Sequence, residues 1–365
     1  MQVVFLAILI LGVTTSLYGV TKVKTFTVDG QKLKLEEVAK VGGIPWGFTF
    51  LTADSMLVTL RGGGIRLVRI KEGKVRSLNN PLSVVAQGQG GLLDIVKDPN
   101  FKNTKKLYVS YSSGSSSRPT VYLSQLRYGN ELRLEKHLLK AKADTSTGVH
   151  FGSRLAIHRG FIYMTIGDRG RRHKAQSLAS HQGKILRLKL DGSVPRNNPF
   201  VGQKGALPEI WSYGHRNPQG LYITSRGKVW AMEHGPKGGD ELNLIKPGRN
   251  YGWPKITYGK EYSGGYIAPS KGAGMEQPVK YYVPSIAPCG LTGYQGSRLK
   301  IFRNSLFAGA LKATHLNRLV LEGTSVVGEE RLFEELQERI RHVKEGPDGR
   351  LYFSTDTGRV LRITD

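Results

Sequence analysis

The sequence predicts an all-β protein, and specifically a six-bladed β-propeller. Three observations favour this fold. Helical periodicity is weak almost throughout the 365 residues, whereas short apolar segments bounded by Gly, Asn, Asp and Pro recur along the whole chain. A two-strand unit is repeated six times, with a Gly-containing turn between its strands. The first apolar anchors of successive units are roughly 45 to 77 residues apart, which is a typical period for propeller blades.

Each repeated unit contains a short strand after a polar turn, then a turn and a second apolar strand. Because such a small sheet cannot bury both of its faces, neighbouring units are expected to cover each other as blades. A series of eight-stranded sandwiches is the structural alternative, but it does not explain the shared turn chemistry. The units occupy residues 56–70, 106–114 with the following VYLSQLRY, 161–170 with the following KILRLKL, 228–245, 305–322 and 350–363.

Two segments between the units need separate interpretation. The longest spacing, between Val229 and Leu306, leaves room for loops on one face, and it contains the glycine-rich and aromatic stretch 250–270. The lone helical signal, GEERLFEELQERI at 328–340, is weak, because the overlapping LQERIRHV can equally form outer strands of a blade.

The N-terminal residues predict export. The apolar run from Val3 to Val13 is much shorter than the ~20 residues of a membrane helix, and small residues follow it. We interpret residues 1–20 as a signal peptide and residues 21–365 as a single propeller domain. No Lys or Arg precedes the run, so a buried N-terminal strand remains the alternative. The destination expected of this signal is a periplasm.

The amino-acid composition restricts how the protein can be stabilised and which partners it can bind. Cys289 is the only cysteine, so no internal disulfide can form. The formal net charge of +26 indicates an anionic partner. The basic residues are scattered and accompany no nucleic-acid motif, which argues against nucleic acid. An anionic cofactor, acidic envelope polymers or a negatively charged electron acceptor would explain the charge equally well.

The loop EHGPKGGDELN, residues 233–243, has the composition of a cation site. Glycine permits unusual backbone shapes and proline lacks an amide donor, so Gly235 and Pro236 can turn carbonyl oxygens toward one point. Carboxylates follow at Asp240 and Glu241, and carbonyls beside carboxylates are typical ligands of calcium. The alternative is an ordinary turn with solvated acids.

His150 and Asp168 are candidates for acid–base chemistry. His150 precedes an expected strand, and Asp168 begins a turn one strand later. Because the ends of neighbouring antiparallel strands lie together, the imidazole and carboxylate can come within hydrogen-bond reach. A carboxylate that holds an imidazole in one tautomer makes a good general base. The alternative is a packing histidine at a blade edge and an unrelated turn acid.

Cationic and amide side chains form a second candidate set. Arg339 and Arg341 alternate along an expected strand, so both guanidinium groups would lie on one face and could clamp carboxylates. Taken singly, each cation could be a solvated surface charge. The other members of the set are Arg216, Lys312, Gln89 and Asn217.

Several long segments, in a fixed order along the chain, carry a family resemblance. They are GQGGLLDIVKDPNF, HFGSRLAI, IYMTIGDRG, HQGKILRLKLDGSVPRNNPF, PEIWSYGHRNPQGL, EHGPKGGDELNLIKPGRNYGWP and KEGPDGRLYFSTDTGRVLRI. From about Gly43 to the C-terminus, the sequence resembles the soluble quinoprotein glucose and aldose sugar dehydrogenases that use pyrroloquinoline quinone (PQQ). The variant EHGPKGGDELN looks more like the aldose sugar branch. Family members are six-bladed propellers, which agrees with the repeat count.

The resemblance implies a role for each candidate residue. His150 matches the base that takes the proton from the anomeric hydroxyl, and Asp168 matches the acid that orients it. Gly235 and Pro236 match carbonyls that bind calcium beneath the cofactor, and Glu241 with Tyr251 matches a second calcium site. The residues that match those holding the quinone or lying near cofactor and substrate are Gln89, Arg216, Asn217, Lys312, Arg339 and Arg341.

The resemblance also implies a reaction. An aldose would be oxidised at C1 to its lactone, with hydride transfer to C5 of the quinone and electrons passing on to an acceptor such as a quinone or a cytochrome. No integral membrane segment is expected, and the assembly would be a monomer or a homodimer. The segment 283–285 and His234 depart from the glucose branch, which bears on sugar specificity. A glycan-binding propeller without catalysis and a calcium-dependent lactonase are the alternative functions.

Overall fold

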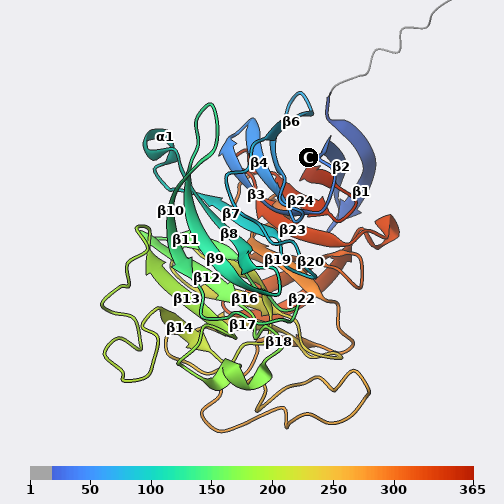
Figure 1. Ribbon diagram of the computed structural model, residues 1–365. Helices are drawn as coiled ribbons and strands as arrows, with labels where there is room; N and C mark the ends of the chain where they lie inside the picture. Colours follow the sequence, from blue (N-terminus) through green and yellow to red (C-terminus); the bar gives the residue numbers. More distant parts are fainter. Residues whose placement is uncertain (1–18) are drawn as a thin grey trace, which may run out of the picture.

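Six antiparallel sheets surround a central axis in the computed structural model of the chain, which describes residues 19–365 (Figure 1). The innermost strands of the sheets contact one another in cyclic order, so the ring is closed. The predicted all-β, six-bladed propeller is therefore confirmed. Most of the proposed signal peptide, residues 1–18, lies outside the described residues.

The blades follow one another in chain order, with the strands of each blade ordered from the innermost outward. Blade 1 contains β3 (Pro45–Thr52), β4 (Ser55–Leu60), β5 (Ile65–Arg69) and β6 (Lys74–Leu78). Blade 2 contains β7 (Leu92–Lys97), β8 (Lys106–Ser115), β9 (Arg118–Arg127) and β10 (Arg133–Lys140). Blade 3 contains β11 (Leu155–His158), β12 (Phe161–Ile166), β13 (Lys184–Lys189) and β14 (Ile210–Tyr213).

The second half of the ring repeats the same arrangement. Blade 4 contains β15 (Pro218–Ile223), β16 (Val229–Glu233), β17 (Asp240–Ile245) and β18 (Lys280–Tyr282). Blade 5 contains β19 (Pro288–Gly293), β20 (Ser305–Ala310), β21 (Leu316–Glu322) and β22 (Ser325–Leu332). Blade 6 contains β23 (Ile340–Glu345), β24 (Leu351–Thr355), β25 (Arg359–Thr364), β2 (Gln31–Lys40) and β1 (Thr21–Val28).

Helical structure among the described residues is confined to single turns. They are α1 (Phe101–Thr104), η1 (Arg172–Gln176), η2 (Lys300–Phe302) and η3 (Glu334–Leu336). None of the helices in residues 19–365 is long and apolar enough to span a bilayer.

Blade 6 joins the two ends of the described chain. Strand β2 pairs antiparallel with β25, with Leu35 opposite Ile363, and both side chains are fully buried. In Figure 1, the blue strands β1 and β2 lie beside the red C-terminal strands. The ring is thus closed by a shared sheet, so opening it would expose buried apolar surface and break a strand ladder.

Each of the six repeated units of the sequence corresponds to the second and third strands of one blade. Segment 328–340 is not a helix: it contains the end of β22, the short turn η3 and the start of β23. Phe333 and Gln337 have positive φ values of 68° and 54°, which a continuous helix does not allow. The expectation of outer strands is wrong for 340–345, because β23 is the innermost strand of blade 6.

The apolar core lies between blades. One buried cluster joins Trp46 of blade 1, Val121 of blade 2 and Ile162 of blade 3, and another joins Trp230 of blade 4 with Leu319 of blade 5. Each blade therefore buries its two faces against its neighbours. This arrangement leaves the central axis free for polar side chains.

Arg154, directly before β11, lies at the centre of that axis and is 1% exposed. Its guanidinium group stacks on Trp46, with 3.8 Å from the central carbon to the ring centroid. It contacts the innermost strand of every other blade. The partners are the carbonyls of Trp46, Gln219 and Arg341, the carboxylate of Asp94, the thiol of Cys289 and the ring of His342.

Candidate functional site

Above Arg154, the beginnings of the innermost strands and the loops before them enclose a polar cavity of about 290 Å³. We call it the upper cavity. Four of the residues singled out from the sequence line it: Gln89, Asn217, Arg339 and Arg341. The remaining lining residues are Ile44, Trp46, Arg61, Gln219, His234, Ala287, Leu311 and Asp356.

His150 and Asp168 are brought together as predicted. The imidazole Nδ1 lies 2.7 Å from Oδ1 of Asp168. His150 has a φ of 53°, so the backbone turns sharply before β11 and places the ring beside the carboxylate. The His150 amide donates a hydrogen bond of 2.8 Å to Oε1 of Gln89, which lines the upper cavity. The histidine is therefore held by both its backbone and its ring.

Asp168 is itself fixed by two further donors. The indole Nε1 of Trp253 donates to Oδ2 at 2.7 Å, and the amide of Gly170 donates to Oδ1 at 2.8 Å. Burial opposes ionisation of Asp168, but the bond to His150, the nearby Arg216 and the Gly170 amide outweigh it, and the net pKa is lowered. The carboxylate is therefore ionised at neutral pH, which directs the imidazole proton to Nδ1.

The imidazole of His150 is suited to accept a proton. Burial lowers its pKa, and the positive charge of Arg216 adds to this effect, although the bond to Asp168 opposes both. The ring is thus largely neutral near pH 7. Within residues 19–365, Nε2 has no hydrogen-bond partner, while the side chain is 14% exposed. A neutral imidazole with one nitrogen oriented and the other free has the properties of a general base.

Arg339 and Arg341 share one carboxylate, that of Asp356. Arg341 forms a two-pronged pair, with Nε 2.8 Å from Oδ1 and Nη2 2.7 Å from Oδ2, and Arg339 Nε lies 2.8 Å from Oδ2. Burial alone would raise the pKa of Asp356, but the two guanidinium groups reverse the effect and lower it. The arginines are therefore held on one side of the upper cavity by an acid that sequence reasoning missed.

Arg216 does not line the upper cavity but lies beside it, above the indole of Trp253. Its Nη1 donates to the carbonyl of Gly235 at 2.6 Å, and its Nη2 lies 3.3 Å from the hydroxyl of Tyr262. Nε of Arg216 is buried without a hydrogen-bond partner among the described residues. Lys312 is exposed and does not line the upper cavity, although its neighbour Leu311 does.

The predicted cation loop encloses a much smaller space, of about 10 Å³, which is roughly the size of one water molecule. Gly235, Glu241 and Tyr251 line it, and Pro236 lies next to Gly235. Asp240 is not available to a cation. Its Oδ1 accepts the Gly235 amide, and its Oδ2 accepts the Ser285 hydroxyl and two backbone amides. It therefore stabilises the loop.

Glu241 is paired across the sheet with a second acid, Glu233. Glu233 accepts hydrogen bonds from the His215 ring and from the Arg216 amide, whereas Glu241 accepts one from Asn243. Burial and the charge of Glu233 raise the pKa of Glu241. Oδ1 of Asn243 is buried without a partner among the described residues. These oxygen atoms are the kind of ligand that calcium prefers.

In residues 19–365, no three His, Cys, Asp or Glu side chains are grouped so as to hold a metal. A cation in this loop would therefore depend on backbone carbonyls, as the sequence pattern predicts. The carbonyl of Gly235 is engaged by Arg216, so that guanidinium would have to move for the oxygen to serve as a ligand. The donor set fits a hard cation with this one rearrangement.

Sequence reasoning assigned no place in the site to Arg61, His234, Trp253 and Asp356. A signal for three of them was present. Arg61, His234 and Asp356 directly follow the second strands of their blades, which is also nearly the position of Asp168 in blade 3. Aligning the ends of the second strands would have identified them as a group. Trp253 lies in an irregular loop, and no spacing in the sequence predicts its contact with Asp168.

A family model described as Glucose / Sorbosone dehydrogenase matches residues 43–362. The chain is 38% identical over 332 residues to aldose sugar dehydrogenase YliI of Escherichia coli, covering 88% of this chain and 90% of that protein. A crystal structure of glucose dehydrogenase is 40% identical, with a TM-score of 0.87, over 90% of this chain and 98% of that one. The PQQ-bound aldose sugar dehydrogenase of Streptomyces coelicolor is 26% identical, with a TM-score of 0.77, over 94% and 97%.

Proposed function

The chain belongs to the glucose and sorbosone dehydrogenase family of oxidoreductases, and we propose that it oxidises the C1 hydroxyl of cyclic aldoses to lactones with PQQ and calcium. The observation that carries the proposal is the pair of His150 and Asp168 beside the upper cavity. Nε2 of His150 has no hydrogen-bond partner among the described residues, and the histidine contacts Gln89 in the wall of a cavity rich in cations. This arrangement supports removal of a hydroxyl proton rather than glycan binding alone.

The upper cavity suits an anionic cofactor. Three guanidinium groups, those of Arg61, Arg339 and Arg341, line it together with one carboxylate, that of Asp356. Burial lowers the pKa of the lining His234, so this ring adds no charge near pH 7. The excess of positive charge matches the three carboxylates of PQQ. The side-chain amide nitrogens, Nε2 of Gln89 and Nδ2 of Asn217, make no hydrogen bond within residues 19–365 and are available as donors.

Each site residue has its own role in the proposed reaction. When bound, the quinone would supply the hydride acceptor and calcium would polarise it as a Lewis acid. His150 would accept the proton of the C1 hydroxyl at Nε2, while Asp168 and Trp253 hold the ring in position. Arg339 and Arg341 would neutralise carboxylates in the upper cavity. Arg216 and Lys312 would contribute cations from its margin.

The calcium site would use the carbonyls of Gly235 and Pro236, with Glu241 and Tyr251 as a second set. What supports this is the lack of a cationic partner for Glu241 within the described residues, beside a space large enough for one ion. A divalent cation would relieve the repulsion between Glu241 and Glu233. The same proposal includes export to a periplasm and transfer of electrons to a separate quinone or cytochrome.

Reconstitution tests the proposal. Purified apo-protein is mixed with PQQ and Ca²⁺, and reduction of a redox dye is followed after addition of glucose or another aldose. We expect turnover that requires the quinone, the cation and the sugar together. Lactone hydrolysis that needs calcium but no quinone would favour the lactonase alternative. Failure to bind the quinone, as followed by calorimetry, would refute the cofactor assignment.

A further inference from the structure

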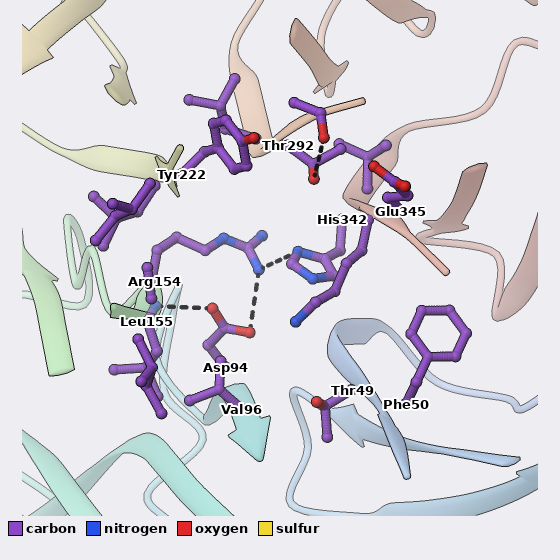
Figure 2. A pocket seen from close by; sticks show the side chains of 18 of the residues that line it. Thr49, Phe50, Asp94, Val96, Arg154, Leu155, Tyr222, Thr292, His342 and Glu345 are labelled. Atoms are coloured by element: carbon purple, nitrogen blue, oxygen red, sulfur yellow. Dashed lines mark hydrogen bonds and ion pairs between the residues drawn. The ribbon is translucent and has the colours of Figure 1, made fainter. Parts of the chain in front are cut away.

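A second, larger cavity of about 540 Å³ lies on the other side of Arg154. We call it the lower cavity. The second halves of the six innermost strands line it, so every blade contributes to its wall. Figure 2 shows Arg154, Asp94 and His342 close together in the wall of this cavity, and we call Arg154 and its hydrogen-bond partners the plug between the two cavities. Its volume lies within the range of roughly 300 to 1,000 Å³ that is typical of small-molecule sites.

Two ammonium groups in the lower cavity lack partners. Lys97 of β7 and Lys344 of β23 line the space, and the ammonium group of neither lysine makes a hydrogen bond or an ion pair with any residue in 19–365. Burial lowers the pKa of both lysines. For Lys344, the charge of Asp94 opposes this effect and the charge of Lys97 adds to it. The two cations therefore repel each other in a partly desolvated space, which an anion between them would relieve.

The carboxylates of the lower cavity are already engaged. Asp94 lies 3.8 Å from Arg154 and accepts the backbone amides of Leu155 and Ile95, each at 2.9 Å. Glu345 accepts the amide of Gln295 at 2.7 Å. The acids therefore have partners of their own, while the lysine ammonium groups remain without hydrogen bonds.

His342 provides a neutral donor beside these cations. Its Nδ1 accepts a hydrogen bond from Arg154 at 2.8 Å, and because arginine is always protonated, the ring proton must lie on Nε2. That nitrogen is buried and has no hydrogen-bond partner in the described part of the chain, and the residue is 7% exposed. An unpaired N–H at the wall of a polar cavity costs free energy unless a ligand accepts from it.

We propose that the lower cavity binds a small organic anion, a carboxylate or a phosphate ester, whose acidic group lies between Lys97 and Lys344. A single inorganic ion would leave most of the volume unfilled. The polar and apolar parts of the wall, which include the Tyr222 hydroxyl, Thr292 and Phe50, suit the remainder of such a molecule. This inference does not depend on the proposed sugar oxidation, because the plug around Arg154 separates the two cavities.

Calorimetry with two simple anions tests the proposal at low ionic strength. Glycerol 3-phosphate serves as the phosphate ester, malate as the carboxylate and glycerol as the uncharged control. We expect at least one anion to bind with one site per chain, and glycerol not to bind. Lys97→Gln and Lys344→Gln should each weaken binding by about tenfold or more, since each removes a charged hydrogen-bond donor.

Two further variants locate the binding. Lys204→Gln removes an exposed lysine away from the lower cavity, and Arg339→Gln removes a cation from the upper cavity. Both should bind the anion as the parent does. Circular dichroism and thermal unfolding would establish that each variant is folded. The proposal would be overturned if the parent protein bound neither anion, or if Lys97→Gln and Lys344→Gln both bound with the affinity of the parent. Loss of binding in Arg339→Gln alone would also overturn it.

Discussion

Replacing His150 by Ala separates a catalyst from a binding protein. If Nε2 of His150 is the general base, reduction of bound quinone by an aldose should slow by ~10² to 10⁴. Affinity for the quinone should change little, because the side chains that line the upper cavity remain. The assay is single-turnover reduction of the bound quinone, followed by absorbance after rapid mixing with glucose.

The expected effect on stability follows from the contacts of the imidazole. The substitution removes one hydrogen bond, that of Nδ1 with Asp168, while the carboxylate keeps its bonds from Trp253 and Gly170. Because the acid keeps two donors, the loss should be about 1 to 2 kcal/mol in the free energy of unfolding. Denaturation with urea measures this value.

A matched control is His158→Ala at the far end of β11, since His158 has none of these contacts. It should leave the reduction rate unchanged. If folded, quinone-loaded His150→Ala reduced its cofactor at the parental rate, the proposed base would be wrong. A large loss of stability with a normal rate in the folded fraction would instead indicate a structural histidine.

Three other predictions follow from the same structure. Turnover should fall only below pH 6.5, the ordinary pKa of histidine, because the lowered pKa of His150 keeps the base neutral down to that range. A rate that rises toward acid pH would contradict this prediction. The stability of the apo-protein should fall as pH rises above 4.5, because the raised pKa of Glu241 makes the folded state bind more protons than the unfolded state. Glu241→Gln should flatten this pH dependence. The same variant should abolish stabilisation by Ca²⁺ in thermal unfolding. Arg154→Met should lower the free energy of unfolding in urea by about 3 to 5 kcal/mol, because it leaves Asp94 buried without the guanidinium group that it faces. The control Arg226→Met, at an exposed site, should change this free energy little. Equal urea midpoints for the two variants would refute the central role of Arg154.

The sequence predicted the blades well because their second and third strands are short, largely apolar segments separated by Gly-containing turns. In β24, for example, Leu351 and Phe353 are fully buried between blades, and the Gly358 turn leads directly into β25. Such strands contribute to local cores, so their pattern is visible in a short window of sequence. The number of blades followed from counting these units.

The sequence did not identify which strands are innermost, and the reason is physical. Strand β23 includes Arg341 and His342, and β7 includes Asp94, because these strands face a polar axis on one side. Their composition therefore looks like that of loops or edge strands. The resemblance to known dehydrogenases singled out Arg341 and Gln89, and both line the upper cavity. It did not indicate Asp356, which determines how the two arginines are held.

The geometry of the axis depends on residues from different blades meeting at one point, and no local pattern encodes such a meeting. Arg154 shows this most clearly, since its partners come from five other blades and lie up to 188 positions away along the chain. The apolar packing between blades determines where those partners are, and the buried guanidinium group then requires nearly all of them to be hydrogen-bond acceptors. Interblade packing thus sets the positions of the two cavities, whereas the charges of a few axial residues determine what each cavity can bind.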